Sequence, residues 1–587
     1  MALKRSFIFI GFFIFSLQSV FCQQKKTIHI YEDGKKTETT TIGDSSKIFV
    51  VLETYLNTLK SNGFAAAALD SLQQSGDTAF AYIYKGNLYF ISNLSLNISP
   101  EIIKNLKLDK QLKNTSKFVY TDLEAISKEI NYYLENRGYP FAKVFYENWQ
   151  IQDDSFSMQL SLDNGNFISI DSFSNKTKSK ISNSLLKAYL GISIGDSYNE
   201  SLLKNMDAKL RKLPYLNVSK PSEIVFSENG AAINVSVERK KTNQVDFIFG
   251  ILPKNTITGK TTITGEARVN LWNAFGKGEK IFIEWRKLER SSQNLQLLFE
   301  YPFLLGTAIG INTDFGLKKR DTSHLDINWS VGIPYQFSGN GRIKLFFKNF
   351  QTLVLRPDTA FAARTKTLPV LQDVSSFVYG AEIYFDALDN LFQPQSGWEI
   401  LGSVGIGTRK IKRNVAYSEI ESTAFPDYNF DNLYDSIDTK SLKSEIAWQL
   451  NYYWRFANHH VAKFGTQGKG IFNKNLLENE YFRIGGAKIL RGFDDESIRV
   501  SLYSMLNFEY RYLLSSNSYV FLFVDAAFTQ QKSAQMTQND FPFGFGAGIN
   551  FSTKVGVFGL TYGIGREQKN PIDFRGAKIH FGYLNYF

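Results

Sequence analysis

The segment IAWQLNYYWRFA, residues 446–457, alternates between two kinds of side chain. A period of two residues is that of a β-strand, in which successive side chains point to opposite faces of the sheet. One face of this strand carries Gln449, Asn451 and Arg455. The other face is apolar and rich in aromatic rings, and it consists of Ile446, Trp448, Leu450, Tyr452, Trp454 and Phe456.

The same alternation recurs in the C-terminal part of the chain, residues 244–587, and is clearest at residues 281–286, 295–301 and 502–514. A soluble β-sandwich also alternates. The aromatic apolar faces and the charged opposite faces favour a membrane β-barrel with a lipid-facing outer surface and a wet lumen. At roughly 20 residues for each strand with its turn or loop, this part accommodates about 16 antiparallel strands.

Composition and hydropathy agree with such a barrel. Aromatic residues make up 15% of the chain, with 51 Phe and 30 Tyr, which is typical of barrels with aromatic girdles. No later apolar run is long enough for a transmembrane helix, so the chain would cross a bilayer as a closed barrel with its backbone groups paired between strands. The net charge of +11 is not accompanied by a basic block with a reading motif, so nucleic acid is not an expected partner.

The N-terminus has the order of a secretory signal peptide. Lys4-Arg5 precede an apolar run at residues 7–17, and a short polar stretch ends at Cys22. We expect residues 1–22 to be the signal peptide, with cleavage after Cys22. Lipidation of Cys22 is the alternative, which Phe21 disfavours because a lipobox has a small residue there. Cys22 is the only cysteine, so the mature chain would have no disulfide framework.

The part of the chain before Gln244 mixes helical and strand patterns and repeats itself weakly. Apolar residues at helical spacing mark residues 52–59, 123–134 and 202–210. We expect three α+β units of one strand, two helices and two strands, the first without a clear opening strand. The first unit would close with strands at residues 79–84 and 88–96. The three units are assigned to residues 26–90, 88–165 and 166–241.

One turn in this part resembles a known family. Residues 136–144, NRGYPFAKV, resemble the helix-to-strand turn of polypeptide-transport-associated (POTRA) domains, with Gly138 and Tyr139 in the turn. Gly138 is expected to cap its helix in the left-handed conformation. The resemblance implies an arm of about three POTRA-like domains, whose open sheet edges could each accept an extended client strand.

Three segments of the C-terminal part resemble the BamA/TamA superfamily, most closely its TamA-like type. Residues 485–493, GGAKILRGF, resemble its loop signature through Arg491, Gly492 and Phe493. Residues 386–397 resemble its mid-barrel strand and turn. Residues 523–527, FVDAA, resemble its late strand, although Ala527 stands where the family usually has glycine. The chain ends at Phe587, as such barrels commonly end in an aromatic residue.

The resemblance implies that Asp525 receives the loop arginine, Arg491. The alternation of residues 519–528 places Asp525 on the lumen face, opposite an apolar set that suits lipid. The planar fork of arginine binds a carboxylate through two hydrogen bonds. The alternative is that Asp525 is an ordinary solvated acid of the lumen.

The sequence offers no expected catalytic, cofactor or metal site, so an enzyme is not predicted. None of the five histidines stands at a metal-ligand spacing with a nearby acid. There is no Gly-x-Ser-x-Gly elbow and no phosphate loop. The glycine-rich residues 544–548 are more typical of bulges or close strand contacts. The histidines are His29, His324, His459, His460 and His580, and the adjacent pair is expected at a loop or strand end.

A closed barrel would pair its first strand, near residues 244–251, with its last, near residues 577–587. Gly582 interrupts the last strand and is expected to weaken this seam, although a harmless bulge is the alternative. The resemblance implies that the seam opens sideways to template client strands.

The resemblance implies an outer-membrane protein, its arm in the periplasm, that inserts or passes client polypeptides without nucleotide. Its partners would be outer-membrane or secreted polypeptides, lipid and periplasmic assembly proteins. We favour an insertase over a two-partner-secretion-type pore, because such pores have about two POTRA units. Such pores also usually begin with a plug helix, whereas residues 23–48 are polar. A porin-like role is least favoured, since porins lack POTRA repeats.

This reading predicts where the protein resides. The full-length chain should fractionate with the outer membrane, and protease added to intact cells should leave the N-terminal arm uncut, because the arm would face the periplasm. Recovery of the full-length chain in the soluble fraction would contradict the prediction.

Overall fold

The computed structural model describes residues 26–42, 47–113, 120–228, 230–252, 262–287, 292–338, 340–390, 393–421, 425, 427–435, 437–487, 489–515, 518–533, 536–553, 556–567 and 571–584. The predicted signal peptide with Cys22 and the terminal Phe587 lie outside these residues. Within the described residues, no helix is both long enough and apolar enough to cross a membrane.

The first N-terminal unit is a four-stranded sheet in the order β2-β1-β4-β3, with β1 parallel to β4. Its helix buries Leu52 and Leu59, two residues of the predicted apolar stripe, in a core that contains Ile28, Ile30 and Ala81. Its elements are β1 (Lys26–Glu32), β2 (Lys35–Ile42), α1 (Ile48–Ser61), β3 (Ala68–Ser75) and β4 (Thr78–Tyr84).

This unit departs from the predicted order of one strand, two helices and two strands. The polar residues 26–42 form the hairpin β1–β2, so an opening strand is present, and α1 is its one helix among the described residues. The strand predicted at residues 88–96 belongs to the next sheet, because β5 (Phe90–Asn97) pairs with β7 (Ser155–Asp163). That pairing joins residues far apart in the chain, so local periodicity could not reveal it.

The next two units have the predicted element order, apart from an extra helical break in each. The sheet orders are β5-β7-β6 and β8-β10-β9. The helices of the second unit are α2 (Pro100–Leu106), α3 (Leu108–Lys113) and α4 (Tyr120–Glu135), followed by β6 (Lys143–Gln152). The third unit contains β8 (Ser169–Asn175), α5 (Asn183–Leu190), α6 (Glu200–Lys204), α7 (Met206–Arg211), β9 (Leu216–Phe226) and β10 (Gly230–Arg239). The domain boundaries assigned from sequence stay a prediction.

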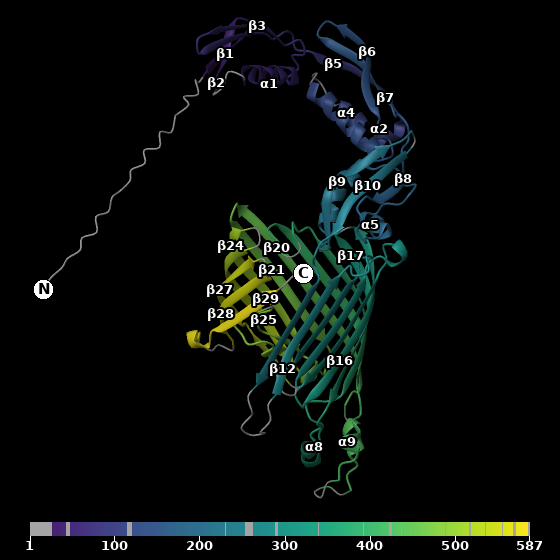
Figure 1. Ribbon diagram of the computed structural model, residues 1–587, viewed down its shortest axis with the longest axis vertical. Coiled ribbons are helices and arrows are strands. Elements are labelled where there is room, and N and C mark those ends of the chain that lie inside the picture. The colour runs from purple at the N-terminus through teal and green to yellow at the C-terminus, as the bar shows by residue number, and fades with distance from the viewer. Residues whose placement is uncertain are drawn as a thin grey trace, which may run out of the picture. The chain divides into compact units, whose positions relative to one another are not determined.

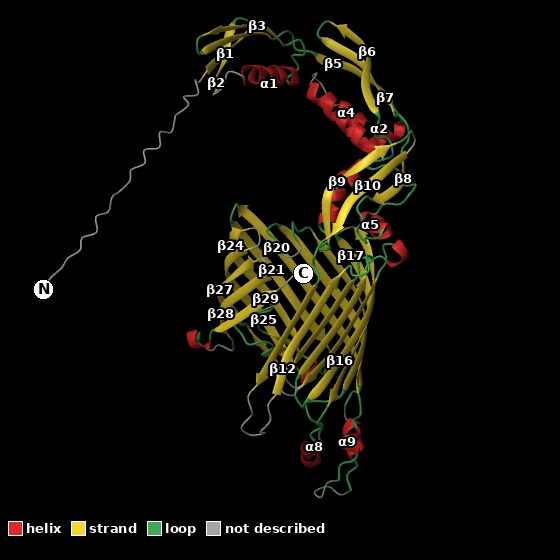
Figure 2. Cartoon of the chain, viewed as in Figure 1, coloured by secondary structure: helices red, strands yellow, loops and turns green. Residues whose placement is uncertain are grey.

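The C-terminal part is one large antiparallel sheet that curls into a barrel wall (Figures 1 and 2). The sheet order follows the chain from β11 to β29. The short β26 and the longer β27 both pair with β25 on either side of Phe541-Pro542, so they act as one interrupted strand. Counted this way, the described sheet has sixteen strands, which confirms the predicted fold class.

The bounds of the barrel strands are β11 (Gln244–Leu252), β12 (Thr262–Trp272), β13 (Lys280–Lys287), β14 (Gln293–Tyr301), β15 (Ile311–Arg320), β16 (His324–Ser338), β17 (Gly341–Val354), β18 (Val374–Asp386), β19 (Gly397–Ile411), β20 (Lys440–Ala457), β21 (His460–Phe472), β24 (Leu502–Ser515), β25 (Ser518–Lys532), β26 (Thr537–Asp540), β27 (Phe543–Thr553), β28 (Gly556–Arg566) and β29 (Lys578–Leu584). The adjacent histidines His459 and His460 lie where β20 gives way to β21, as predicted.

Burial in the barrel is the reverse of burial in a soluble domain. On β20 the apolar Leu450, Tyr452 and Trp454 are exposed, whereas Asn451 is buried. On β24 the exposed Leu506 and Phe508 oppose the buried Glu509 and Arg511. The alternation predicted from sequence is therefore confirmed, with the apolar face outward and the charged face in the lumen.

Among the described residues, β11 and β29 are the two ends of the sheet, and no ladder joins them. The predicted pairing of the first strand with the last is thus not formed there. Gly582 does not interrupt β29, because it pairs with Gly559 of β28 in an unbroken register. Neither the predicted interruption nor the alternative bulge is present at this position. Both differences from the prediction concern which strands pair with each other. The type of a single residue does not determine that pairing.

The inverted burial predicts that the same substitution has unequal effects on unfolding free energy at two adjacent residues. Leu450→Arg should cost roughly 2–4 kcal/mol of unfolding free energy in a bilayer, because it places a charge in lipid near mid-strand. Gln449→Arg, the matched control, faces the lumen and should change it by less than about 1 kcal/mol. Denaturant unfolding from lipid vesicles measures both values, and equal costs would contradict the assigned faces.

Candidate functional site

The segment of residues 473–501, between β21 and β24, folds back into the lumen, because its side chains contact inward-facing residues of the wall. It contains the short strands β22 (Phe482–Ile484) and β23 (Ile498–Val500), which pair with each other. Arg491, Gly492 and Phe493 lie between these two strands. We call residues 473–501 the lumen segment.

Arg491 and Asp525 form the pair that the resemblance implied. Arg491 Nε and Nη2 donate to the two carboxylate oxygens of Asp525 at 2.8 and 2.7 Å. The backbone N–H of Arg491 also donates to Asp525, at 3.1 Å. Asp525 is fully buried. The alternative of an ordinary solvated lumen acid is therefore wrong, since Asp525 is enclosed by donors.

The pair is part of a larger network that the sequence did not indicate. Arg491 Nη1 donates to Glu509 at 2.6 Å, and Arg511 Nε donates to the other oxygen of Glu509 at 2.7 Å. Asn507 Nδ2 donates to Asp525 at 2.8 Å. Two arginines thus contact two carboxylates in one connected network. Residues 507, 509 and 511 all fall on the lumen side of the sequence alternation. Alternation indicates the face on which a side chain lies, but it does not indicate which residue that side chain contacts.

The loop tip fits against glycines of the wall. Gly492 has a φ of +92°, and a Cβ there would lie 2.6 Å from the carbonyl carbon of Ile564. A Cβ on Gly544 would lie 1.9 Å from the backbone oxygen of Arg491. A Cβ on Gly565 would lie 2.6 Å from the oxygen of Gly492. The predicted close strand contact within residues 544–548 is confirmed at Gly546, where a Cβ would lie 2.0 Å from the backbone oxygen of Tyr562 in β28.

Phe493 anchors the tip on its other side. It is buried in an apolar cluster that joins the lumen segment to β24 and β25. Ala527 belongs to this cluster, so its methyl group contributes packing where the family usually has glycine. The other fully buried members are Ile484, Leu490, Val500, Tyr503 and Met505.

The turn of residues 386–397, which joins β18 to β19, contacts the same network. The backbone oxygen of Pro394 accepts a hydrogen bond from Arg511 Nη1 at 3.2 Å. The Asp389 carboxylate accepts from the backbone N–H of Gln395 and Ser396. Gly397 has a φ of +102°, and a Cβ there would meet the oxygen of Ala387 at 2.1 Å. The turn reaches the ion pairs through Arg511.

The turn at Gly138 and Tyr139 ends α4 as predicted. Gly138 has a φ of +94°, the left-handed conformation. Its carbonyl oxygen accepts from Ile168 at 2.8 Å, and its N–H donates to the oxygen of Tyr198 at 3.0 Å. The Tyr139 ring packs edge-on against Phe167. The role of this turn in client binding stays a prediction.

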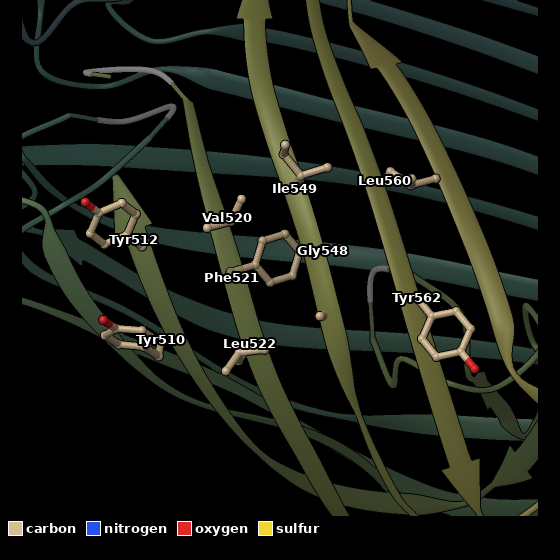
Figure 3. A pocket seen from close by; sticks show the side chains of 10 residues that line it. Tyr510, Tyr512, Val520, Phe521, Leu522, Gly548, Ile549, Leu560 and Tyr562 are labelled. Atoms are coloured by element: carbon tan, nitrogen blue, oxygen red, sulfur yellow. The ribbon is translucent and has the colours of Figure 1, made fainter. Parts of the chain in front are cut away.

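The lipid-facing surface has a recess over β24, β25, β27 and β28 (Figure 3). Its volume is about 500 Å³. The recess forms where the small Ala547 and Gly548 lie between larger side chains. These are Tyr510, Tyr512, Val520, Phe521, Leu522, Ile549, Leu560 and Tyr562. Nearly all of this lining is apolar, so the recess suits lipid chains rather than a polar ligand.

Among the described residues, no group of three or more His, Cys, Asp or Glu side chains is placed to hold a metal ion. The contacts at the candidate site are ion pairs and hydrogen bonds, which hold the lumen segment against the barrel wall.

Known proteins share this fold. The family model described as the Omp85 superfamily domain matches residues 273–583. CdiB from Escherichia coli superimposes with a TM-score of 0.52 at 12% identity, over 92% of this chain and 97% of that one. CdiB from Acinetobacter baumannii gives 0.51 at 11% identity, over 92% and 98%. BamA from Haemophilus ducreyi lacking POTRA domains 1-3 gives 0.43 at 13% identity, over 85% and 100%. None of the curated protein sequences matches the chain.

The buried geometry predicts strong coupling between Arg491 and Asp525. Asp525→Ala should cost roughly 3–5 kcal/mol of unfolding free energy, because it leaves Arg491 with an uncompensated buried charge. The double variant with Arg491→Ala should cost less than the sum of the single variants, as a double-mutant cycle measures. Glu478→Ala, which removes an exposed ion pair with Arg499 in the same segment, should cost about 1 kcal/mol or less. Additive costs would show that Arg491 and Asp525 act independently.

Proposed function

The chain belongs to the Omp85 superfamily, and from this membership and the edges of its barrel sheet we propose that it inserts client polypeptides into the bacterial outer membrane. The family model covers more than half of the chain, from residue 273 to residue 583. The resemblance to the BamA/TamA superfamily is thereby confirmed. The TamA-like type stays a prediction, and so does the periplasmic position of the N-terminal arm.

The observation that carries the proposal is the unjoined seam. In the described residues, β11 and β29 end the sheet without pairing to each other. A strand edge presents unpaired N–H and C=O groups, which an extended client strand can complete. The side chains beside these edges are apolar and exposed, at 59% for Phe247 and 70% for both Ile579 and Phe581. A client strand added here would meet lipid on one face, as the barrel wall itself does.

The N-terminal units offer edges at which a client could be held before insertion. β6 is an edge strand of its sheet, and Phe145, Trp149 and Ile151 on it are exposed. A bulge between Glu147 and Gln150 interrupts its pairing with β7. An apolar edge strand of this kind suits an extended and partly apolar polypeptide.

Insertion needs no nucleotide under this proposal. A client that moves from water into the bilayer buries apolar surface, which stabilises the inserted state by about 25 cal/mol per Å². Closing its own backbone ladder removes unpaired polar groups from lipid. The protein would then lower the barrier by offering a template edge.

A second candidate is a pore that passes a secreted polypeptide through the lumen. The charged lumen favours it, since ion pairs such as Lys344–Glu382 at 2.9 Å and Lys348–Glu445 at 2.8 Å line the inner face. Passage would require the lumen segment to move, whereas insertion at the seam does not. Profiling outer-membrane proteins after depletion separates the two, because a pore affects one exported protein and an insertase affects many barrels.

Joining the seam should abolish insertion. We expect that a disulfide between Phe247→Cys and either Ile579→Cys or Phe581→Cys blocks client insertion into liposomes, and that reduction restores it. The matched control joins Leu560→Cys to Phe581→Cys, which are already cross-strand partners in β28 and β29. This control leaves the seam free and should retain activity in the oxidised state. Full activity with the seam joined would rule out insertion at this edge.

A further inference from the structure

The lumen segment has a second buried contact with the wall, distinct from the Arg491 network. Arg409 of β19 and Glu480 have fully buried side chains. Arg409 Nε lies 2.9 and 3.0 Å from the two Glu480 oxygens, and Nη2 lies 2.6 Å from one of them. Nothing in the sequence patterns indicated this pair, because the two residues are separated by 71 positions and Glu480 lies outside any strand.

The turn that carries Glu480 crosses between distant parts of the wall. Asn479 Nδ2 donates to Thr352 of β17 at 3.3 Å and to the backbone oxygen of Gln372 at 2.9 Å. Tyr481 donates to the backbone oxygen of Lys532 of β25 at 2.9 Å. In the sheet, β17 and β19 are separated from β25 by β20, β21 and β24. Residues 477–481 therefore bridge two sides of the lumen.

This bridge lies at the end of the barrel from which the long loops leave, which we call the outer end. Arg409 is two residues from the end of β19, whereas Asp525 lies in the middle of β25. Beyond the bridge, the described parts of loops 355–373 and 412–439 pack around a small core (the helices α8, Thr359–Thr365, and α9, Val415–Ser418, at the bottom of Figure 2). Leu477 packs against this core. Burial there raises the pKa of Tyr417 to about 12, so its hydroxyl stays neutral.

The free energy of a buried ion pair favours two states of the Arg409–Glu480 contact, fully formed or fully broken. A buried ion pair adds little net stability, but losing one partner is strongly unfavourable because the other charge is left unpaired. The turn therefore stays in place until both charges become hydrated together. Arg409 Nη1 has no hydrogen-bond partner among the described residues, so this pair is less completely satisfied than a structural anchor would be.

We propose that Arg409 and Glu480 form a second latch, which holds residues 477–481 across the outer end of the lumen and keeps the lumen closed at that end. Glu480 is a positioning residue in this device, acting on the turn rather than on a client. The inference deepens the proposed function, since a barrel that inserts clients at its seam has to keep its lumen sealed. It acts independently of the Arg491 network, which holds the tip of the same segment at mid-barrel.

The test is single-channel recording of the purified full-length protein in planar lipid bilayers. Glu480→Gln should raise the mean conductance and the open time several-fold, because the neutral amide no longer holds Arg409. Asp435→Asn, which weakens the exposed pair with Arg413 in the nearby loops, is the matched control and should leave the recordings unchanged. Loss of heat-modifiable mobility would reveal a variant that fails to fold.

If Glu480→Gln fails to fold, a second variant still tests the proposal. Arg409→Met combined with Glu480→Leu removes both charges and leaves no buried orphan, so it should fold and conduct like Glu480→Gln. The buried Leu476, substituted as Leu476→Cys, should react with an impermeant thiol reagent on intact cells only when the latch is removed. Unchanged conductance and an unreactive thiol in folded variants would overturn the latch. Neither the conductance nor the thiol reaction depends on client insertion. These experiments therefore distinguish a failure of the proposed latch from a failure of the proposed insertion activity.

Discussion

In a bilayer every backbone N–H and C=O has to find its partner within the protein, and the rest of this structure depends on that constraint. The chain meets it with a ladder in which the barrel strands follow their order in sequence, with β21 and β24 paired across the lumen segment. Because lipid replaces water outside the ladder, the exposed side chains are apolar and the charged ones face inward. At the ends of the ladder, β11 and β29, the described structure leaves the constraint unmet. An incoming strand would be favoured at those edges for the same reason that the wall itself is stable.

The inward charges, together with the apolar cluster around Phe493, explain how a long segment can reside in the lumen. Arg491 alone is held by two carboxylates and stacks over the Phe523 ring at 3.8 Å. Such contacts fix position more than they stabilise the fold, because the cost of removing charges from water offsets most of their attraction. Further pairs tie the segment to other strands, as where Arg320 of β15 meets Glu496 at 3.1 Å. A segment held by charges at separate points is specific in position and releasable in steps.

The N-terminal units obey the opposite burial rule. Ile28, Leu108 and Val235 are fully buried in their respective units, as in soluble domains. Their helices cover one face of each sheet, and strands such as β6 have a partner strand along only one edge among the described residues. One chain thus presents sheet edges in two environments, with water around the first set and lipid beside the second. A β-strand client could pair with either without any change in the chemistry of recognition.

Sequence alone determined what depends on neighbours in the chain. The period of two in residues 446–457 determined which faces meet lipid, and the helical spacing of Leu52 and Leu59 determined which face of α1 is buried. Arg491 and Asp525 were matched only through a family signature, since their partnership is not local. Tertiary structure decided the contacts that join distant residues: the parallel pairing of β1 with β4, the addition of Glu509 to the arginine network, the pairing of Arg409 with Glu480, and the unjoined seam. The physical reason is that periodicity records the side of an element on which a residue lies, whereas a hydrogen bond or an ion pair requires two groups to meet at a few ångströms, and only the folded chain brings them there.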